Sequence, residues 1–395
     1  MEETVATMKL LKDIRILEFG AFITGPFASM LLAELGADVI KVEKPGSGDP
    51  FRAFRSGLYS PHFQAHNRNK RSVALDYTQP EGLATLQALV KTADVVVINS
   101  RPSVAKSIGI DYEAMRQINP RLIYCAITGF GPDGPYADRP AFDNVGQALS
   151  GWGSRHRHGD DPRVVGPAIA DPVTSYYAAL GILAALHERD LSGKGHLIEV
   201  NMLESMINLA TEPIASYFDS GKPIPVLYRG AMSQAYNLTC KDGKRIGLHL
   251  SSPDKFWEGL CRAIGRTELI AKYPTRMDRA KHYEALAMEL NEIFRQRNRD
   301  EWIALLERED VPFAPEHEIQ DLADDPQVRH LGVFYEIEHP KYGTVKGTQP
   351  PVHVDSTRLE DLRPPPDLGE HSDEILREAG ISPEQIARLR EKGLV

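Results

Sequence analysis

A single acidic residue stands at the start of a long apolar stretch. Asp171 is followed by Pro172 and then by the segment 173–186, in which apolar residues dominate. A carboxylate in such a place can act as a nucleophile in covalent catalysis. It can also simply cap a helix, because Asp is favoured at the N-cap and Pro at the first helical position. Both interpretations place the start of a buried helix at Asp171.

No other segment carries a stronger catalytic motif. The sequence has no GxxxxGK[ST] phosphate loop, and residues 20–25 do not match GxGxxG. The motifs HExxH and GxSxG are also absent. Two histidines and two aspartates stand close together in the loop 156–161, but a flexible loop provides no preorganised metal site. We therefore predict no metal, and Asp171 is the main candidate nucleophile.

The composition limits the partners and the compartment. The 395 residues carry a net charge of −9, which disfavours nucleic-acid binding. No apolar run approaches the roughly 20 residues of a membrane span. The N-terminus lacks the pattern of a signal peptide, and three widely spaced cysteines, Cys125, Cys240 and Cys261, do not form a disulfide framework. We expect a cytoplasmic protein that binds neither nucleic acid nor a membrane.

Basic residues gather in one part of this acidic chain. The segment 41–71 holds seven Lys or Arg residues against Glu43 and Asp49. A local positive field favours a small polyanionic ligand. An ordinary solvated surface explains the same pattern.

Strands and helices alternate through the first part of the chain. Apolar runs at 13–20 and 94–100 are typical of buried parallel strands, and Gly25 and Gly36 delimit a helix that connects two such strands. This alternation predicts an α/β fold with a doubly wound, Rossmann-like sheet. Ligands of such a sheet bind beyond the carboxyl ends of its strands. The corresponding segments are 20–26, 43–49, 99–103 and 129–143.

The chain is predicted to have a large and a small domain. Residues 1–220 form the first part of the large domain. Residues 225–325 contain a hairpin pattern and charged helices, which predict a smaller α/β domain. Residues 326–395 return to the large domain and end in two short helices.

Five blocks of the chain, taken together and in order, carry a family resemblance. They are LEFGAFITGPFASMLLAELGADVIKVEKPGSGDPFR, NRNKRSVALD, ADVVVINSRPSVAKSIGIDYEAMRQINPRLIYCAITGFGPDGPYADRPAFDNVGQALSG, AIADPVTSYYAALGILAALHERDLSGKGHLIEVNMLE and PDLGEHSDEILREAGIS. These blocks resemble the class III CoA-transferases, a family that includes formyl-CoA transferase, carnitine CoA-transferase and the α-methylacyl-CoA racemases. The resemblance runs from about residue 12 to the end and is weak across 220–340. It implies an interlocked homodimer.

The resemblance implies that Asp171 is the nucleophile of a CoA-transferase. The carboxylate forms an acyl-aspartyl anhydride and then an aspartyl-CoA thioester, and CoA passes from an acyl-CoA to a small carboxylic acid. No tightly bound cofactor is required, and coenzyme A enters as part of the substrate. At a helix N-terminus Asp171 should stay ionised, and the free N–H groups there could stabilise charge on the attacked carbonyl oxygen.

The resemblance also implies CoA contacts. Lys70 and Arg71 are expected to be structural. Ser107, beside Lys106, replaces an arginine found in many relatives, which leaves one phosphate contact open. The implied contact positions are Ile23, Thr24, Lys44, Leu75, Asn99, Arg101, Phe142 and Asp143.

Several alternatives remain open. The racemases have a histidine where this chain has Phe142, and phenylalanine cannot move a proton. A non-catalytic CoA-binding member would lack the acid, which is present. The stretch 229–236, with Gln234, lacks the glycine run of formyl-CoA transferases, which weakens formate–oxalate exchange. The loop 154–163 either binds a second carboxylate of a dicarboxylic substrate or is a solvated flap. Its basic residues are Arg155, His156, Arg157, His158 and Arg163.

Overall fold

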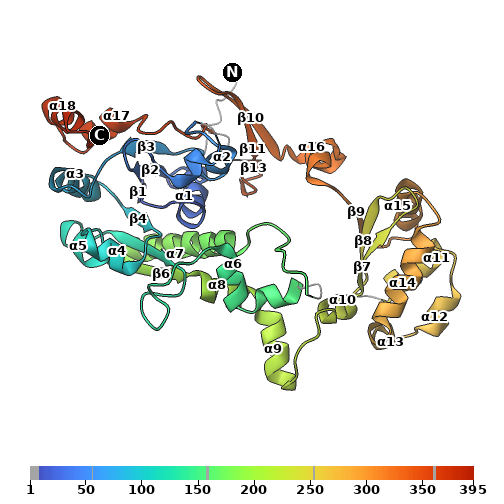
Figure 1. Cartoon of the computed structure of the whole chain (residues 1–395). Coiled ribbons are helices and arrows are strands. Elements are labelled where there is room, and N and C mark those ends of the chain that lie inside the picture. Colours follow the sequence, from blue (N-terminus) through green and yellow to red (C-terminus); the bar gives the residue numbers. More distant parts are fainter. Residues whose placement is uncertain (1–8, 56, 157–159, 252–253, 359–361) are drawn as a thin grey trace. The chain divides into compact units, whose positions relative to one another are not determined.

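The computed structural model describes residues 9–55, 57–156, 160–251, 254–358 and 362–395 (Figure 1). The chain divides into two compact units. Unit 1 comprises Met1–Thr211 and Val333–Val395, and unit 2 comprises Glu212–Gly332. These limits differ by several residues from the limits at 220–225 and 325–326 that the sequence predicts.

Unit 1 is built on a parallel sheet of six strands in the order β3-β2-β1-β4-β5-β6. The predicted parallel α/β sheet is therefore confirmed. The order reverses between β1 and β4, and such a reversal opens a crevice at the carboxyl ends of the strands. The strands are β1 (Arg15–Glu18), β2 (Asp38–Glu43), β3 (Arg71–Ala74), β4 (Val95–Ile98), β5 (Ile123–Thr128) and β6 (Leu197–Asn201).

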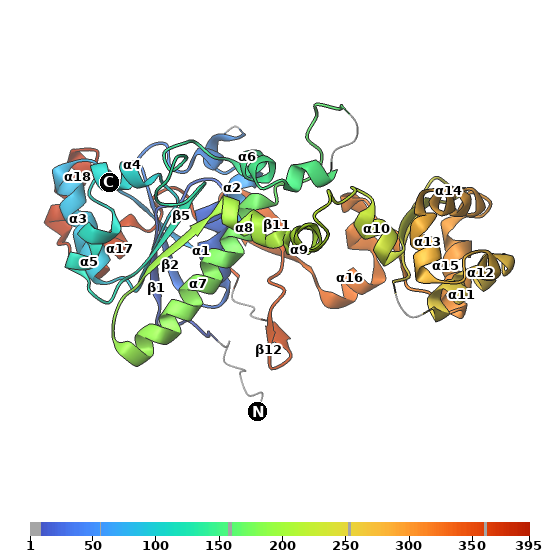
Figure 2. The ribbon, with the colours of Figure 1, turned by 90° about the horizontal axis from the view of Figure 1, so that it is seen from below.

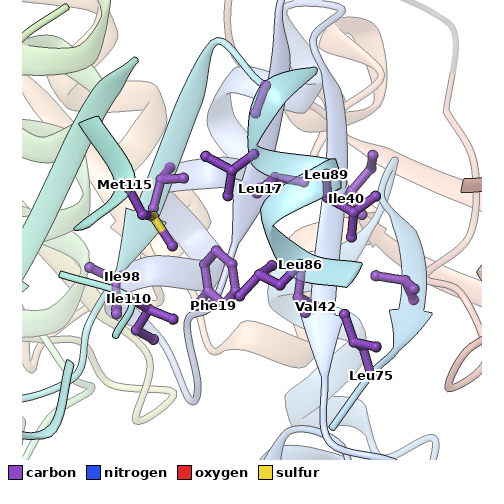
Figure 3. Close-up of a cluster of buried hydrophobic side chains, with 14 of the residues drawn as sticks. Leu17, Phe19, Ile40, Val42, Leu75, Leu86, Leu89, Ile98, Ile110 and Met115 are labelled. Carbon is purple, nitrogen blue, oxygen red and sulfur yellow. The ribbon is translucent and has the colours of Figure 1, made fainter. Parts of the chain in front are cut away.

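Helices cover both faces of this sheet, because successive strand residues point to opposite sides. Leu17 packs in the hydrophobic cluster that contains Leu86, Leu89 and Met115 (Figure 3). Its neighbour Ile16 packs in a second cluster on the other face, with residues of α1 and α7. Figure 2 shows the long α7 beside α1. The helices of unit 1 that surround the sheet are α1 (Thr24–Glu34), α2 (Pro61–Asn67), α3 (Pro80–Lys91), α4 (Pro102–Ser107), α5 (Tyr112–Ile118), α6 (Asp143–Leu149), α7 (Ala170–Ser192) and α8 (Met202–Leu209).

The end of the chain returns to unit 1. The helices α17 (Ser372–Glu378) and α18 (Pro383–Glu391) lie beside β3 and α3 (Figure 1). Lys392 Nζ and Arg388 Nη2 both contact Glu81 Oε1, at 2.6 and 3.2 Å. Before them come the hairpin strands β10 (Phe334–His339) and β11 (Gly343–Thr348), and the short strands β12 (His353–Val354) and β13 (Thr357–Arg358).

Unit 2 packs helices around a small antiparallel sheet. Its strands are β7 (Ala235–Thr239), β8 (Arg245–His249) and β9 (Phe313–Glu316), in that order. None of the helices formed by the described residues is both long enough and apolar enough to cross a membrane. The helices α9–α16 span Thr211–Ser220, Tyr228–Ser233, Lys255–Ala263, Glu268–Lys272, Arg276–Lys281, Tyr283–Phe294, Arg299–Arg308 and Pro326–Leu331.

Candidate active site

A cavity of about 380 Å³ opens at the carboxyl ends of β1, β4 and β5, where the strand order reverses. Its volume falls in the range of small-molecule sites. Among the described residues that line it, Asp171 carries the only carboxylate, and no histidine is present. The lining residues are Phe19, Ala21, Phe22, Ile23, Thr24, Asn99, Ser100, Arg101, Val104, Ile127, Thr128, Gly129, Ala137, Arg139, Pro140, Ala141, Phe142, Asp171 and Met202.

Asp171 lies in the first turn of α7 and does not cap it. The helix begins at Ala170, and its N-cap residue, Ile169, makes no side-chain cap. The cap comes from Asp143, whose Oδ1 accepts hydrogen bonds from the N–H groups of Ile169 (2.7 Å), Ala170 (2.7 Å) and Asp171 (3.2 Å). The prediction that Asp171 itself is the N-cap is therefore wrong.

The hydrogen bonds to Asp143 use the backbone N–H groups at the start of α7, which were expected to stabilise the attacked carbonyl oxygen. The N–H groups of Ala170 and Asp171 donate to Asp143, Pro172 has none, and Val173 N donates to Ile169 O. A helix start normally leaves such groups free for a ligand. The prediction that these N–H groups remain available to stabilise a carbonyl oxygen is therefore wrong in this structure.

The surroundings of Asp171 disfavour its charged form. Asp171 is only 8% exposed. Burial, and secondarily the nearby Asp143 carboxylate, raise the pKa of Asp171 from its usual value to about 7. Both causes act in the direction expected for an acid that is desolvated beside a like charge. The expectation that Asp171 stays ionised is therefore corrected: near neutral pH the protonated and the charged form are both populated.

The turn after β1 forms one wall of the cavity. Ile23 and Thr24, two predicted CoA contacts, lie in this lining beside Phe22. Asn99 fastens the turn: its Oδ1 accepts from Ala21 N (3.0 Å), and its Nδ2 donates to Ala21 O (2.8 Å) and Thr24 Oγ1 (2.9 Å). Asn99 thus lines the cavity as predicted for a contact residue, but its side-chain amide is occupied in holding the wall.

The two other predicted contacts in this lining come from different loops. Arg101 follows β4, is exposed, and donates from Nη1 to Asp138 O at 3.1 Å. Phe142 is 60% exposed and stands edge-on to Phe22, with ring centroids 5.7 Å apart. The structure therefore brings Ile23, Thr24, Asn99, Arg101, Phe142 and Asp171 together.

Three predicted contacts lie outside the lining. Lys44 is exposed after β2. Leu75 is fully buried in the core, so a contact through its side chain is ruled out (Figure 3). Asp143 holds the start of α7 with Oδ1, and its Oδ2 accepts from Gln147 Nε2. In this structure Asp143 therefore acts as a helix cap, and its predicted contact with CoA stays a prediction.

Arg139 is a cavity residue that the sequence did not single out. Its guanidinium lies 3.9 Å from the centroid of the Tyr136 ring. In the described part of the chain, neither Arg139 nor Arg101 pairs with a carboxylate. The motif DRPAFD, in the loop after β5, was a usable signal, because a cation there falls in the segment 129–143 expected to meet ligands.

The loop 154–163 is only partly described. Arg155 lies in a short 3₁₀ segment, Trp152–His156, whereas Arg157 and His158 fall outside the described residues. Arg163 Nη2 contacts Asp161 Oδ2 at 2.8 Å on the surface.

Two further expectations concern residues away from the cavity. Lys70 and Arg71 are buried and paired with acidic residues, in agreement with a structural role. Gln234, considered as a residue that faces the nucleophile, is fully buried within unit 2 and donates from Nε2 to Ala231 O at 2.6 Å.

A larger depression of about 500 Å³ lies on unit 2. Its charged side chains pair with one another, as in His317–Asp325 (3.0 Å) and Arg245–Glu316 (3.6 Å). Self-paired surface charges are weak evidence of a ligand site. The cavity at Asp171 is therefore the better candidate.

Comparisons with known proteins agree on one family. The family model described as CoA-transferase family III matches residues 11–372. Human succinyl-CoA:glutarate CoA-transferase is 34% identical over 381 residues, which cover 94% of this chain and 86% of the human protein. Formyl-CoA:oxalate CoA-transferase of Rhodopseudomonas palustris (strain BisA53) is also 34% identical, covering 98% of this chain and 97% of the relative. A crystal structure of a CaiB/BaiF family protein from Brucella suis superposes with a TM-score of 0.80 at 31% identity, covering 93% of this chain and 98% of that one.

Proposed function

The chain belongs to CoA-transferase family III, and on that premise we propose that it moves CoA from an acyl-CoA to a carboxylic acid through covalent intermediates on Asp171. The observation that carries the proposal is the place of Asp171. It is the only carboxylate among the described residues that line the cavity at the strand-order reversal.

The reaction consists of acyl exchanges at one carboxylate. An Asp171 oxygen attacks the thioester carbonyl carbon, the C–S bond breaks, and CoA leaves as a thiolate from an acyl-aspartyl anhydride. The thiolate attacks the aspartyl carbonyl carbon, which releases the first acid and leaves an aspartyl-CoA thioester. The acceptor carboxylate attacks this thioester to form a second anhydride and free the thiolate. The thiolate then attacks the acceptor's acyl carbon, and Asp171 is regenerated as a carboxylate.

No step of this sequence transfers a proton. A general acid or base is therefore not needed, and the described cavity lining contains no histidine, lysine or second carboxylate. A racemase must remove and return an α-proton. Phe142 occupies the position at which the racemases have their histidine, so the lining supports transfer rather than racemisation.

We propose that CoA lies along the cavity wall formed by Ile23, Thr24, Asn99, Arg101 and Phe142. Arg101 and Arg139 provide guanidinium groups that form no ion pair within the described part of the chain, and such groups suit phosphate oxygens. Lys44 is exposed at the end of the neighbouring strand and remains a further candidate for a phosphate contact. CoA is substrate here, and no tightly bound cofactor is required.

The acceptor that we propose is a dicarboxylic acid. Glutarate and oxalate, named in the two curated relatives, each carry two carboxylates. The basic loop 154–163, of which residues 154–156 and 160–163 are described, lies between α6 and α7 in the sequence. An Arg155→Ala variant should lose activity toward a dicarboxylic acceptor and keep activity toward a monocarboxylic one. Equal effects on both acids would contradict this assignment.

We also propose that the protein is a homodimer in the cytoplasm. Apolar side chains on α7 and α8 are exposed, among them Tyr176 (55%), Leu180 (62%) and Ile207 (41%). Such a surface is costly for a monomer and is buried well against a second copy. The three cysteines are free thiols, as expected in a reducing compartment.

The central experiment is mass spectrometry of the protein after incubation with a panel of acyl-CoAs, including succinyl-CoA and formyl-CoA. We expect a hydroxylamine-sensitive adduct on the peptide that contains Asp171. The donor that gives the adduct identifies the acyl group. The Asp171→Asn variant is the matched control, because it keeps the size of the side chain and removes the nucleophile. Undiminished transfer by this variant would overturn the mechanism.

A further inference from the structure

A cluster of buried charges lies beneath the turn that forms the cavity wall. Glu18, Lys41, Asp49 and Lys70 are each at most 3% exposed. Glu18 joins the two lysines, with Oε1 2.8 Å from Lys41 Nζ and Oε2 2.8 Å from Lys70 Nζ. Asp49 Oδ2 lies 3.0 Å from Lys41 Nζ. Two positive and two negative charges therefore balance, which is the condition for retaining ions in a protein interior.

Asp49 connects this cluster to the turn. Its Oδ1 accepts hydrogen bonds from Phe51 N at 2.9 Å and from Phe22 N at 3.2 Å. Lys41 supports the same turn by donating to Gly20 O at 2.8 Å. The two oxygens of Asp49 thus have different surroundings. Oδ2 forms an ion pair with the Lys41 ammonium but accepts no hydrogen bond from the described residues, whereas Oδ1 accepts from two backbone N–H groups.

The backbone at Phe22 requires such support. Phe22 has a φ of 64°, in the left-handed region that a bulky residue rarely adopts. A residue in that region persists only where its surroundings hold it there. The Phe22 ring also packs edge-on against Phe51, with centroids 5.3 Å apart, so Asp49 and Phe51 hold the residue from one side.

The turn is also tied to the nucleophile's helix. Ser175 Oγ donates to Thr24 O and to Asp171 O, both at 2.9 Å. Phe22 and Asp171 line the same cavity, so a change in the turn at Phe22 alters the wall of the cavity that contains the nucleophile. The side chain of Asp49 does not line the cavity and so acts only through the turn.

We propose that Asp49 is a positioning residue: ion-paired with Lys41 and accepting a hydrogen bond from Phe22 N, it sets the conformation of the turn 21–24 and thereby the affinity for CoA. This inference rests on the proposed function, because it takes CoA as the ligand of the cavity. Asparagine at this position keeps one oxygen that can accept from the N–H groups, but it loses the negative charge that pairs with Lys41 and places an NH2 group toward that ammonium.

The test compares Asp49→Asn and Asp49→Ala with a matched control, Glu34→Gln. Glu34 forms a buried ion pair with Arg68 at the other end of α1, and neither residue lines the cavity. Isothermal titration calorimetry with CoA measures the Kd of the folded protein. If part of a variant is unfolded, the apparent stoichiometry falls but the Kd does not change. We expect the Kd to rise about tenfold for Asp49→Asn and further for Asp49→Ala, and to be unchanged for Glu34→Gln.

A second measurement does not depend on CoA. Amide hydrogen exchange in the peptide that contains Phe22 should be faster in Asp49→Asn than in wild type and in Glu34→Gln. An unchanged Kd or unchanged exchange in the Asp49→Asn protein overturns the inference. If wild-type protein binds no CoA, the proposed function fails, and the exchange experiment still decides whether Asp49 holds the turn.

Discussion

The pH dependence of the first acylation step offers a direct test of the site. Asp171 reacts only as a carboxylate, and burial together with Asp143 raises its pKa to about 7. Relative to its usual value, this destabilises the ionised form by roughly 4 kcal/mol, since one pKa unit corresponds to about 1.4 kcal/mol. At pH 5 only about one hundredth of the protein carries the reactive charge. The acylation rate should therefore rise about tenfold between pH 5 and 6 and about fivefold between pH 6 and 7, and it should level off above pH 8.

The Asp143→Asn variant separates the two causes of the raised pKa. Asparagine keeps an oxygen that can accept from the N–H groups of Ile169 and Ala170, but it removes the negative charge. The midpoint of the pH profile should move to lower pH while the thermal stability changes little. The Asp143→Ala variant is the contrasting case, because it also loses the cap, at a cost of about 1 kcal/mol.

Rapid-quench single-turnover experiments with mass-spectrometric detection of the acyl-enzyme would measure both profiles. Single-turnover conditions are needed because product release can mask the ionisation of Asp171 under steady state. A rate that does not change between pH 5 and 7 would refute the assignment of the raised pKa to the nucleophile. An identical midpoint in wild type and Asp143→Asn would refute the electrostatic role of Asp143.

Three further outcomes follow from the geometry. In chemical denaturation, the Asp171→Asn variant should be more stable than wild type at pH 8 and equally stable below pH 4. The reason is that the pKa of Asp171 is raised in the folded protein, so its carboxyl group loses its stabilising contribution as the pH rises from about 4 through 7. Arg101→Ala and Arg139→Ala should each raise the KM for an acyl-CoA several-fold with little change in kcat, and neither should affect a pantetheine thioester, which lacks the nucleotide phosphates; equal effects on both substrates would contradict phosphate binding. Gly20→Ala should lower the free energy of unfolding by about 1–3 kcal/mol in denaturant titration, because a Cβ there would lie 2.8 Å from Pro26 Cδ; unchanged stability would show that the turn yields at no cost.

The strands and helices that position the site could be predicted from local sequence patterns. The strand ending before Gly20, the helix over Thr24–Glu34 and the strand over Asp38–Glu43 follow from apolar runs and glycine boundaries. The parallel sheet follows from their alternation, and the crevice follows from the sheet. The position of Asp171 near a helix start was also visible, since Pro172 is compatible only with the first turn of a helix.

Contacts between distant segments could not be predicted in the same way. The cap of α7 comes from Asp143, which lies 28 residues before Asp171 in the chain. Residue preferences at helix starts led us to predict Asp171 as the cap, because an N-cap side chain normally comes from the start of the same helix. The same limit applies to Asn99, whose amide is taken up by the turn at Ala21 and Thr24, 78 and 75 residues away. Pairing of this kind depends on strand order, and strand order is not a property of any single segment.

The pair of carboxylates has a consequence for the covalent chemistry. Asp143 takes the N–H groups that would otherwise stabilise an ionised Asp171, and it adds a like charge beside it. Both effects disfavour the free carboxylate, and both disappear when Asp171 becomes a neutral anhydride or thioester. Burial of the charge, which is the largest cause of the raised pKa, is relieved in the same way. The roughly 4 kcal/mol, of which the Asp143 charge is the smaller part, therefore also shifts the equilibrium from free enzyme toward the acyl-aspartyl and aspartyl-CoA species. Removing the charge in Asp143→Asn should lower the fraction of covalently modified Asp171 at equilibrium with acyl-CoA. The same variant has more of its Asp171 ionised at neutral pH, and a larger supply of the reactive carboxylate would by itself favour the adduct. A smaller adduct fraction would therefore show that loss of the repulsion between Asp143 and Asp171 governs the amount of the intermediates.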